Sequence, residues 1–318
     1  MPEQKLHPQA QQVCDLIVAS GRPPIETLSP AQARQAYLAS RLILQPDPEP
    51  VAEVLSLEAT GPAGPIQLRL YRGQGAANDR PQPALIYFHG GGWVIGDLES
   101  HDQLCRALAN ATPSIVVAVD YRLAPEHKFP AAVEDAIAAT RWIAGNAARL
   151  GIDAARLAVA GDSAGGNLAT VVSLDARDRG GPRLVHQVLI YPGTDMRMGW
   201  PSLERHAQQL PLTRAGMHWF VAHYLRSEAD KADWRASPLI ASSLEGLPPA
   251  LVITAGFDPL CDEGEAYAKA LRSAGVPVLH ERFEGQIHGF LSMGRIVADS
   301  GRGIALAASA LRQSFARA

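Results

Sequence analysis

The chain has 318 residues, 47% of them hydrophobic and 19% charged, so it can bury a substantial core and lacks the composition of a disordered protein. Its net charge of -3 and its lack of Lys/Arg runs argue against binding to nucleic acid or to an anionic membrane surface. We therefore expect neither among its partners.

The first residues, Met1 to Pro8, do not combine a cationic segment with an apolar one, and no later run approaches membrane-spanning length. A cytoplasmic location is the resulting expectation. Cys14, Cys105 and Cys261 are odd in number and widely spaced, which fits neither a disulfide framework nor a zinc site. We expect reduced, structural thiols.

The first 48 residues carry two amphipathic helical patterns. One lies around Pro8 to Ser20. The second runs from Ser29 to Leu44, with Ser29 as N-cap and a proline as the first helical residue. Prolines at alternate positions from Pro46 to Pro50 then predict the end of the helix and a stiff connector.

From Val51 the pattern changes to strands. Alternating apolar residues in 54–58 and 66–72, separated by a Gly/Pro-rich stretch, predict an antiparallel hairpin. Strands and helices then alternate in the order strand 84–88, helix 98–110, strand 114–120, helix 130–148, strand 156–160, helix 164–178 and strand 185–191. Such alternation predicts an α/β fold with a mostly parallel sheet covered by helices on both faces.

Between Thr194 and Ala236 the alternation stops, because residues 212–225 have the pattern of an aromatic-rich helix where a short loop would suffice. Periodicity alone fits a helix over an active site and a surface helix with a core-facing stripe equally well. The core pattern resumes with strand 250–255, helix 262–274, strand 277–283 and a terminal helix from about Arg295.

The segment Gly161-Asp162-Ser163-Ala164-Gly165 matches the G-x-S-x-G nucleophile elbow, whose glycines allow a sharp turn from strand to helix. Five loosely specified positions also recur by chance, so the motif alone fits a Gly-rich turn with a capping serine. At a helix N-terminus, free N–H groups and the helix dipole would favour negative charge beside Ser163.

The segment from His89 to Trp93 follows the predicted strand 84–88 and matches the H-G-G-G oxyanion loop of lipases and esterases. Consecutive glycines are tolerated mainly where the backbone adopts unusual dihedrals or approaches a ligand closely. We expect His89 to fix this loop and Gly90 to shape it. The predicted oxyanion hole consists of the N–H groups of Gly91, Gly92 and Ala164.

A serine nucleophile needs a base, and the base needs an orienting carboxylate, in the chain order Ser, Asp, His in hydrolases with this elbow. Asp258 and His288 lie in the loops after strand 250–255 and after the next strand, where α/β sheets bind ligands. Taken singly, Asp258 could cap a helix and His288 could be solvated. Together with Ser163, they predict a catalytic triad.

These motifs resemble those of the hormone-sensitive-lipase-like esterases, also called bacterial family IV, within the α/β-hydrolase superfamily. The resemblance extends to 120–127, 255–260 and 287–290, and so covers about residue 50 to the C-terminus. It implies an α/β-hydrolase core made of residues 49–194 and 237–318. Residues 1–48 and the insertion 195–236 would form a helical cap over the site.

The resemblance also implies a serine carboxylesterase that hydrolyses short- to medium-chain esters through an acyl-enzyme. Its small-molecule substrate would be its partner, and dimerisation through a sheet edge is known in the family. Neither an H-E-x-x-H motif nor a dinucleotide fingerprint occurs, so we expect no metal and no cofactor. An amidase or peptidase with the same triad, or a receptor on the same fold, is the alternative, although receptors of this kind lose triad residues.

Several neighbours of the motifs have predicted roles. Trp93, Met217, Phe220 and Phe290 are candidates for the substrate pocket, although each would also suit core packing. Asp162 is expected to form structural hydrogen bonds.

We also expect Arg122 to pair with Glu126 behind the oxyanion loop. The family often has Arg at the position of Cys261 and Met at that of Gln286, so the loops bearing Asp258 and His288 have unusual neighbours.

Overall fold

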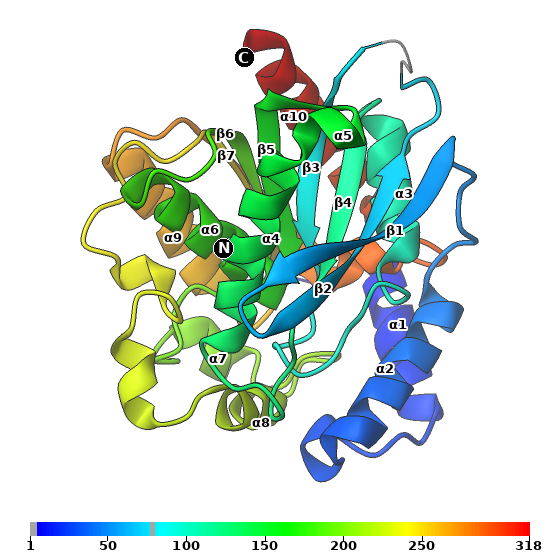
Figure 1. Cartoon of the computed structure of the whole chain (residues 1–318). Coiled ribbons are helices and arrows are strands. Elements are labelled where there is room, and N and C mark those ends of the chain that lie inside the picture. The colour runs from blue at the N-terminus through cyan, green and yellow to red at the C-terminus, as the bar shows by residue number, and fades with distance from the viewer. Residues whose placement is uncertain (1–4, 77–79) are drawn as a thin grey trace.

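A computed structural model describes residues 5–76 and 80–318 (Figure 1). Its eight-stranded sheet has the order β1-β2-β4-β3-β5-β6-β7-β8. The strands are β1 (Glu53–Gly61), β2 (Gly64–Arg72), β3 (Gln82–Phe88), β4 (Ile115–Asp120), β5 (Ile152–Asp162), β6 (Leu184–Ile190), β7 (Ala250–Phe257) and β8 (Val278–Ile287). Only the pairs formed by β2 are antiparallel in this sheet, which confirms the predicted mostly parallel α/β fold.

Helices cover both faces of the sheet (Figure 1). The α-helices are α1 (Pro8–Ala19), α2 (Pro30–Leu44), α3 (Asp102–Ala111), α4 (Ala131–Gly145), α5 (Ala147–Leu150), α6 (Ala164–Asp178), α7 (Pro201–Arg205), α8 (Arg214–Tyr224), α9 (Cys261–Ser273) and α10 (Asp299–Arg317). The described residues also form four short 3-10 helices, which are η1 (Ile25–Thr27), η2 (Glu228–Ala232), η3 (Pro238–Ile240) and η4 (Phe290–Ser292). Helices α4, α6 and α9 pack on one face, and α1, α3 and α10 pack on the other.

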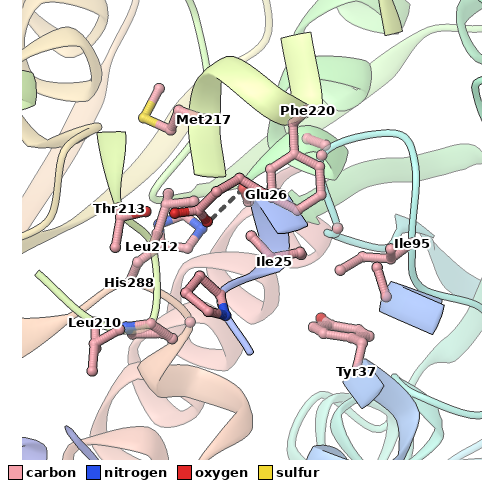
Figure 2. Close-up of a pocket in the computed structure, with 18 of the residues that line it drawn as sticks. Ile25, Glu26, Tyr37, Ile95, Leu210, Leu212, Thr213, Met217, Phe220 and His288 are labelled. Atoms are coloured by element: carbon pink, nitrogen blue, oxygen red, sulfur yellow. Dashed lines mark hydrogen bonds between the residues drawn. The ribbon is translucent and has the colours of Figure 1, made fainter. Parts of the chain in front are cut away.

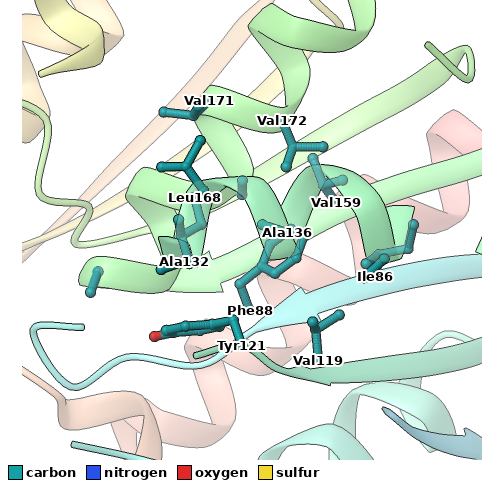
Figure 3. Close-up of a cluster of buried hydrophobic side chains, with 14 of the residues drawn as sticks. Ile86, Phe88, Val119, Tyr121, Ala132, Ala136, Val159, Leu168, Val171 and Val172 are labelled. Atoms are coloured by element: carbon teal, nitrogen blue, oxygen red, sulfur yellow. The ribbon is translucent and has the colours of Figure 1, made fainter. Parts of the chain in front are cut away.

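Strand β3 shows how the core fixes the position of the site, because every one of its residues is buried. Ile86 and Phe88 join the cluster beneath α4 and α6, which Figure 3 shows, whereas Leu85 and Tyr87 join the cluster on the opposite face. Side chains that alternate along a strand point to opposite faces, so a central strand buried on both sides must be apolar throughout. Its carboxyl end therefore places His89 at a rigid edge.

The first predicted helices are confirmed almost to the residue. Ser29 caps α2 in a capping box with Gln32, as its N-cap position predicts. Helix α3 begins at Asp102, four residues later than predicted, because Asp97 and Ser100 hydrogen-bond each other's backbone N–H groups in a preceding turn. Strands β5 and β8 are longer than predicted, since neighbouring strands supply partners that a local pattern does not reveal.

The predicted pairing of Arg122 with Glu126 is wrong. Arg122 instead forms a bidentate ion pair with Asp135 on α4, with both N···O distances 2.8 Å, and its backbone N–H donates to the same carboxylate. Glu126 binds Arg34 of α2 instead. Sequence proximity suggested the first pairing, but the chain turns so that each side chain faces a different helix.

All three cysteines lie within the described residues and are free and buried. None of the helices at 5–76 and 80–318 combines the length and apolar character needed to cross a bilayer.

The ion pairs Arg122–Asp135 and Arg34–Glu126 should contribute differently to the free energy of unfolding. Asp135 is buried, whereas the side chains of Arg34 and Glu126 are 31% and 54% exposed. Asp135→Ala leaves Arg122 without its carboxylate and should lower the free energy of unfolding by about 3 kcal/mol. Glu126→Ala, the matched control, should cost less than about 1 kcal/mol. Urea unfolding measures both, and equal losses would contradict this ranking.

Candidate active site

Ser163 occupies the sharp turn between β5 and α6. Its φ of 55° and ψ of -116° are unusual for a residue with a side chain. The flanking glycines are required by packing: a Cβ on Gly161 would lie 2.2 Å from the backbone of Gly165, and one on Gly165 would lie 1.9 Å from the carbonyl oxygen of Phe88. The turn therefore holds the serine above the carboxyl end of the central strands.

His288 and Asp258 reach the same point from neighbouring strands. Asp258 follows β7 and His288 follows β8, and β5, β6, β7 and β8 are consecutive in the sheet. The Nε2 atom of His288 is 3.0 Å from Ser163 Oγ, and its Nδ1 atom is 2.7 Å from Asp258 Oδ2. The other oxygen of Asp258 accepts the N–H of Leu260 at 2.9 Å. The structure thus joins the three residues predicted as a triad in one hydrogen-bonded chain.

The loop from His89 to Trp93, which we call the glycine loop, lies beside Ser163. Gly91 and Gly92 have φ values of 126° and 57°, which favour glycine. Their N–H groups donate to no other described residue, and Ala164 opens α6, where first-turn N–H groups have no partner within the helix. Gly91, Gly92, Ser163 and Ala164 line one cavity, so the residues predicted to supply the donors border the same space as the serine.

Asp162 anchors the glycine loop from below. It is 3% exposed, and its Oδ1 accepts the N–H of Gly90 at 2.9 Å and the hydroxyl of Tyr87 at 2.7 Å. The ring of His101 lies 3.4 Å from its other oxygen. Burial alone would raise the pKa of Asp162, but His101 and the hydrogen bonds hold that pKa well below its usual range. These contacts confirm the predicted structural role.

His89 stabilises the same loop. Its Nδ1–H donates to the carbonyl oxygen of Gly90 at 2.8 Å, its ring stacks on Tyr121 with centroids 4.3 Å apart, and the Tyr121 hydroxyl donates to the His89 carbonyl. Burial lowers the pKa of His89 to about 4, so the ring is neutral at pH 7. This geometry agrees with the expectation that His89 fixes the loop.

The cavity in front of Ser163 has a volume of about 860 Å³. Met217 and Phe220 of α8 line it, as does Trp93, which stacks on Tyr224 with centroids 4.3 Å apart. A Cβ on Gly92 would lie 2.3 Å from the Phe220 ring, so α8 packs directly on the glycine loop.

Other walls of the cavity come from residues that the sequence analysis does not single out. Figure 2 shows Ile25 of η1, Tyr37 of α2 and Leu212 around the same space as His288. On α2, the lining residues Ala33, Tyr37 and Arg41 recur every fourth position, so they form one helical stripe. This stripe is the sequence signal that could have identified these lining residues. A stripe alone, however, does not indicate which surface it faces.

Phe290 does not belong to the cavity wall, and its predicted place in the substrate pocket is wrong. It is fully buried, with ring centroids 4.8 Å from Phe283 and 5.8 Å from Tyr191. Gly289 has a φ of 79° and turns the chain toward the core directly after His288. The side chain of Phe290 therefore packs beneath the loop.

Cys261 and Gln286, which differ from the residues that the family often has there, form hydrogen bonds with residues outside the triad. The Cys261 thiol donates to Glu265, and the Gln286 side-chain amide donates to Asp299 at 2.8 Å. Both side chains are buried.

Glu263 is a buried carboxyl in the cavity wall that the sequence did not single out. One of its oxygens accepts the backbone N–H groups of Thr194 and Asp195 at 2.6 and 3.2 Å. Burial raises its pKa well above the usual range. It therefore fixes the start of the 195–236 segment without adding an unpaired charge.

Comparison with known proteins supports one family. The family model of the alpha/beta hydrolase fold matches residues 85–292. The chain is 45% identical over 291 residues to the carboxylic ester hydrolase LipN of Mycobacterium tuberculosis, covering 90% of this chain and 77% of LipN. It is 40% identical to the ethyl acetate hydrolase of Pseudomonas putida, covering 91% of this chain and 92% of that protein.

A solved structure supports the same family. The ester-hydrolase EH1AB1 from the metagenome of Lake Arreo superposes with a TM-score of 0.93 at 44% identity, covering 98% of this chain and 99% of the other. The chain therefore belongs to the alpha/beta hydrolase family, among its hormone-sensitive-lipase-like carboxylic ester hydrolases.

Proposed function

We propose that this protein hydrolyses carboxylic esters with Ser163 as the nucleophile, His288 as the base and Asp258 as the orienting acid. The observation that carries the proposal is the hydrogen-bonded chain from Ser163 Oγ through His288 to Asp258, at 3.0 and 2.7 Å. With its proton on Nδ1, the imidazole donates to Asp258 and accepts from the serine hydroxyl. Both relatives named above are ester hydrolases, which does not favour the amide-cleaving alternative.

The reaction proceeds in two steps. Ser163 Oγ attacks the ester carbonyl carbon while His288 Nε2 accepts its proton, and the same proton then passes to the departing alcohol. A water molecule then gives a proton to His288 Nε2 and attacks the acyl-enzyme carbonyl. The bond between the acyl carbon and Ser163 Oγ breaks, His288 returns the proton to that oxygen, and the acid is released. In each tetrahedral intermediate, the N–H groups of Gly91, Gly92 and Ala164 stabilise the oxyanion, and one such donor can be worth roughly 3 kcal/mol.

The cavity supports the substrate class that the family resemblance implies. A volume of about 860 Å³, with walls that include Ile25, Leu212, Met217 and Phe220, suits short- to medium-chain esters. We propose that residues 1–48 and 195–236 form a cap that supplies these walls. The proposal is supported by the contact of Phe220 with Gly92, which brings the second segment onto the glycine loop.

Replacing the nucleophile tests the mechanism. Ser163→Ala should lower kcat at least about 10⁴-fold, because the remaining groups only bind and polarise the ester. The thermal midpoint should change little. Ser173→Ala, on the buried side of the same helix, is the control and should keep its activity. Hydrolysis of a p-nitrophenyl ester measures both variants, and a Ser163→Ala protein that keeps most of its turnover would remove this serine from the mechanism.

Asp162 should act on the reaction through the glycine loop that it anchors. Asp162→Ala removes the acceptor of the Gly90 N–H and should lower kcat about 10- to 100-fold, because the oxyanion donors lose their fixed position. KM should change less than kcat. Asp162→Asn keeps a carbonyl oxygen at the same place and should recover part of the loss. Steady-state kinetics measure both, and a kcat within twofold of the parent in Asp162→Ala would show that the loop does not need this anchor.

Phe220 should limit the length of the acyl chain. Phe220→Ala enlarges the cavity and should raise kcat/KM for octanoate relative to acetate esters about tenfold, since roughly two additional methylenes become buried. His218→Ala, on the exposed side of the same helix, is the control. A panel of p-nitrophenyl esters measures the ratio, and an unchanged chain-length profile would place the acyl group elsewhere in the cavity.

A further inference from the structure

The hydrogen bonds of His288 leave one motion of its ring uncontrolled. Both bonds are formed by ring nitrogens and therefore lie close to the plane of the imidazole. They fix where Nδ1 and Nε2 point, but they resist only weakly a rocking of the ring about the line between Asp258 and Ser163. The next residue, Gly289, has no side chain that could support the ring. Control of the tilt therefore requires a group packed against the imidazole.

Tyr191 supplies such a group. It directly follows β6, between the strand that leads to Ser163 and the strand that leads to Asp258. Its ring centroid lies 4.8 Å from that of His288, with the planes inclined by 57°. No other aromatic ring of the described residues is in contact with this imidazole. Phe290 packs on Tyr191 at 5.8 Å, so the tyrosine is itself supported.

The backbone holds Tyr191 in an unusual conformation. Its φ is 34°, in a region that residues with side chains rarely adopt, and its N–H donates to the carbonyl oxygen of Ile253 at 2.6 Å. Positive φ at a non-glycine residue is unfavourable, and such residues cluster at functional sites. The conformation is therefore maintained by the surrounding structure.

The ring of Tyr191 is the part that contacts the site. Its hydroxyl has no hydrogen-bond partner among the described residues, and the side chain is 1% exposed. Tyr191 is also absent from the cavity wall, so it does not contact the substrate.

We propose that Tyr191 is a positioning residue whose ring fixes the tilt of the His288 imidazole. The proposal rests on the triad assigned above. Because Tyr191 touches the base but not the substrate, its loss acts on proton transfer and leaves substrate binding intact.

Four variants test this role. Tyr191→Phe keeps the ring and should keep kcat within twofold. Tyr191→Leu removes the ring, and Tyr191→Met replaces it with a flexible side chain that fills more of its volume; both should lower kcat about 10- to 100-fold with KM within twofold. Tyr267→Leu, at another fully buried tyrosine, controls for lost stability and should keep kcat.

The readout is kcat and KM per folded molecule, with the folded fraction measured by circular dichroism at the assay temperature. Ser163→Ala is included in the same series. An active Ser163→Ala protein would remove the triad itself. If Ser163→Ala is inactive, a kcat within twofold in Tyr191→Leu or Tyr191→Met overturns the positioning role alone. A loss in Tyr191→Phe equal to that in Tyr191→Leu would assign the effect to the hydroxyl and also overturn the proposal.

Discussion

The sharp turn at Ser163 is the constraint on which the rest of the site depends. A residue with φ of 55° at the end of a buried strand is unfavourable by about 1–3 kcal/mol and persists only where packing determines it. Here the packing is that of α6 against β3 and β5, with Gly161 and Gly165 allowing backbone to approach backbone. The large core on both faces of the sheet stabilises this turn, and the turn places the serine at the wall of the cavity.

The two carboxylates near the serine have different roles because their surroundings differ. Asp258 accepts from the ring of His288 and the N–H of Leu260, so it orients the base. Asp162 accepts from the backbone of Gly90 and from a tyrosine hydroxyl, so it orients the glycine loop. Both are almost completely buried and both are hydrogen-bonded, as buried carboxylates must be. One therefore supports proton transfer, and the other supports the oxyanion donors.

The errors of the sequence-based interpretation have a common origin. Closeness to a motif along the chain predicts the pairing of Arg122 with Glu126 and the place of Phe290 in the pocket. In the structure, Arg122 faces Asp135 on α4, and Phe290 turns beneath the loop after Gly289. Closeness in sequence does not determine the direction of a side chain once the backbone turns. The same reason explains why the role proposed for Tyr191 could not be read from its position after a predicted strand.

The sequence by itself determined the order of strands and helices and the identities of the residues that form the hydrogen-bonded chain. Strand alternation, capping at Ser29 and the glycines around Ser163 are local properties, so a local pattern records them. The tertiary structure decided which segments meet. Ser163 and His288 are 125 positions apart, and α2 reaches the cavity from the other end of the chain. Contacts of that kind depend on how complete faces pack in three dimensions, and a linear pattern of residue types does not specify them.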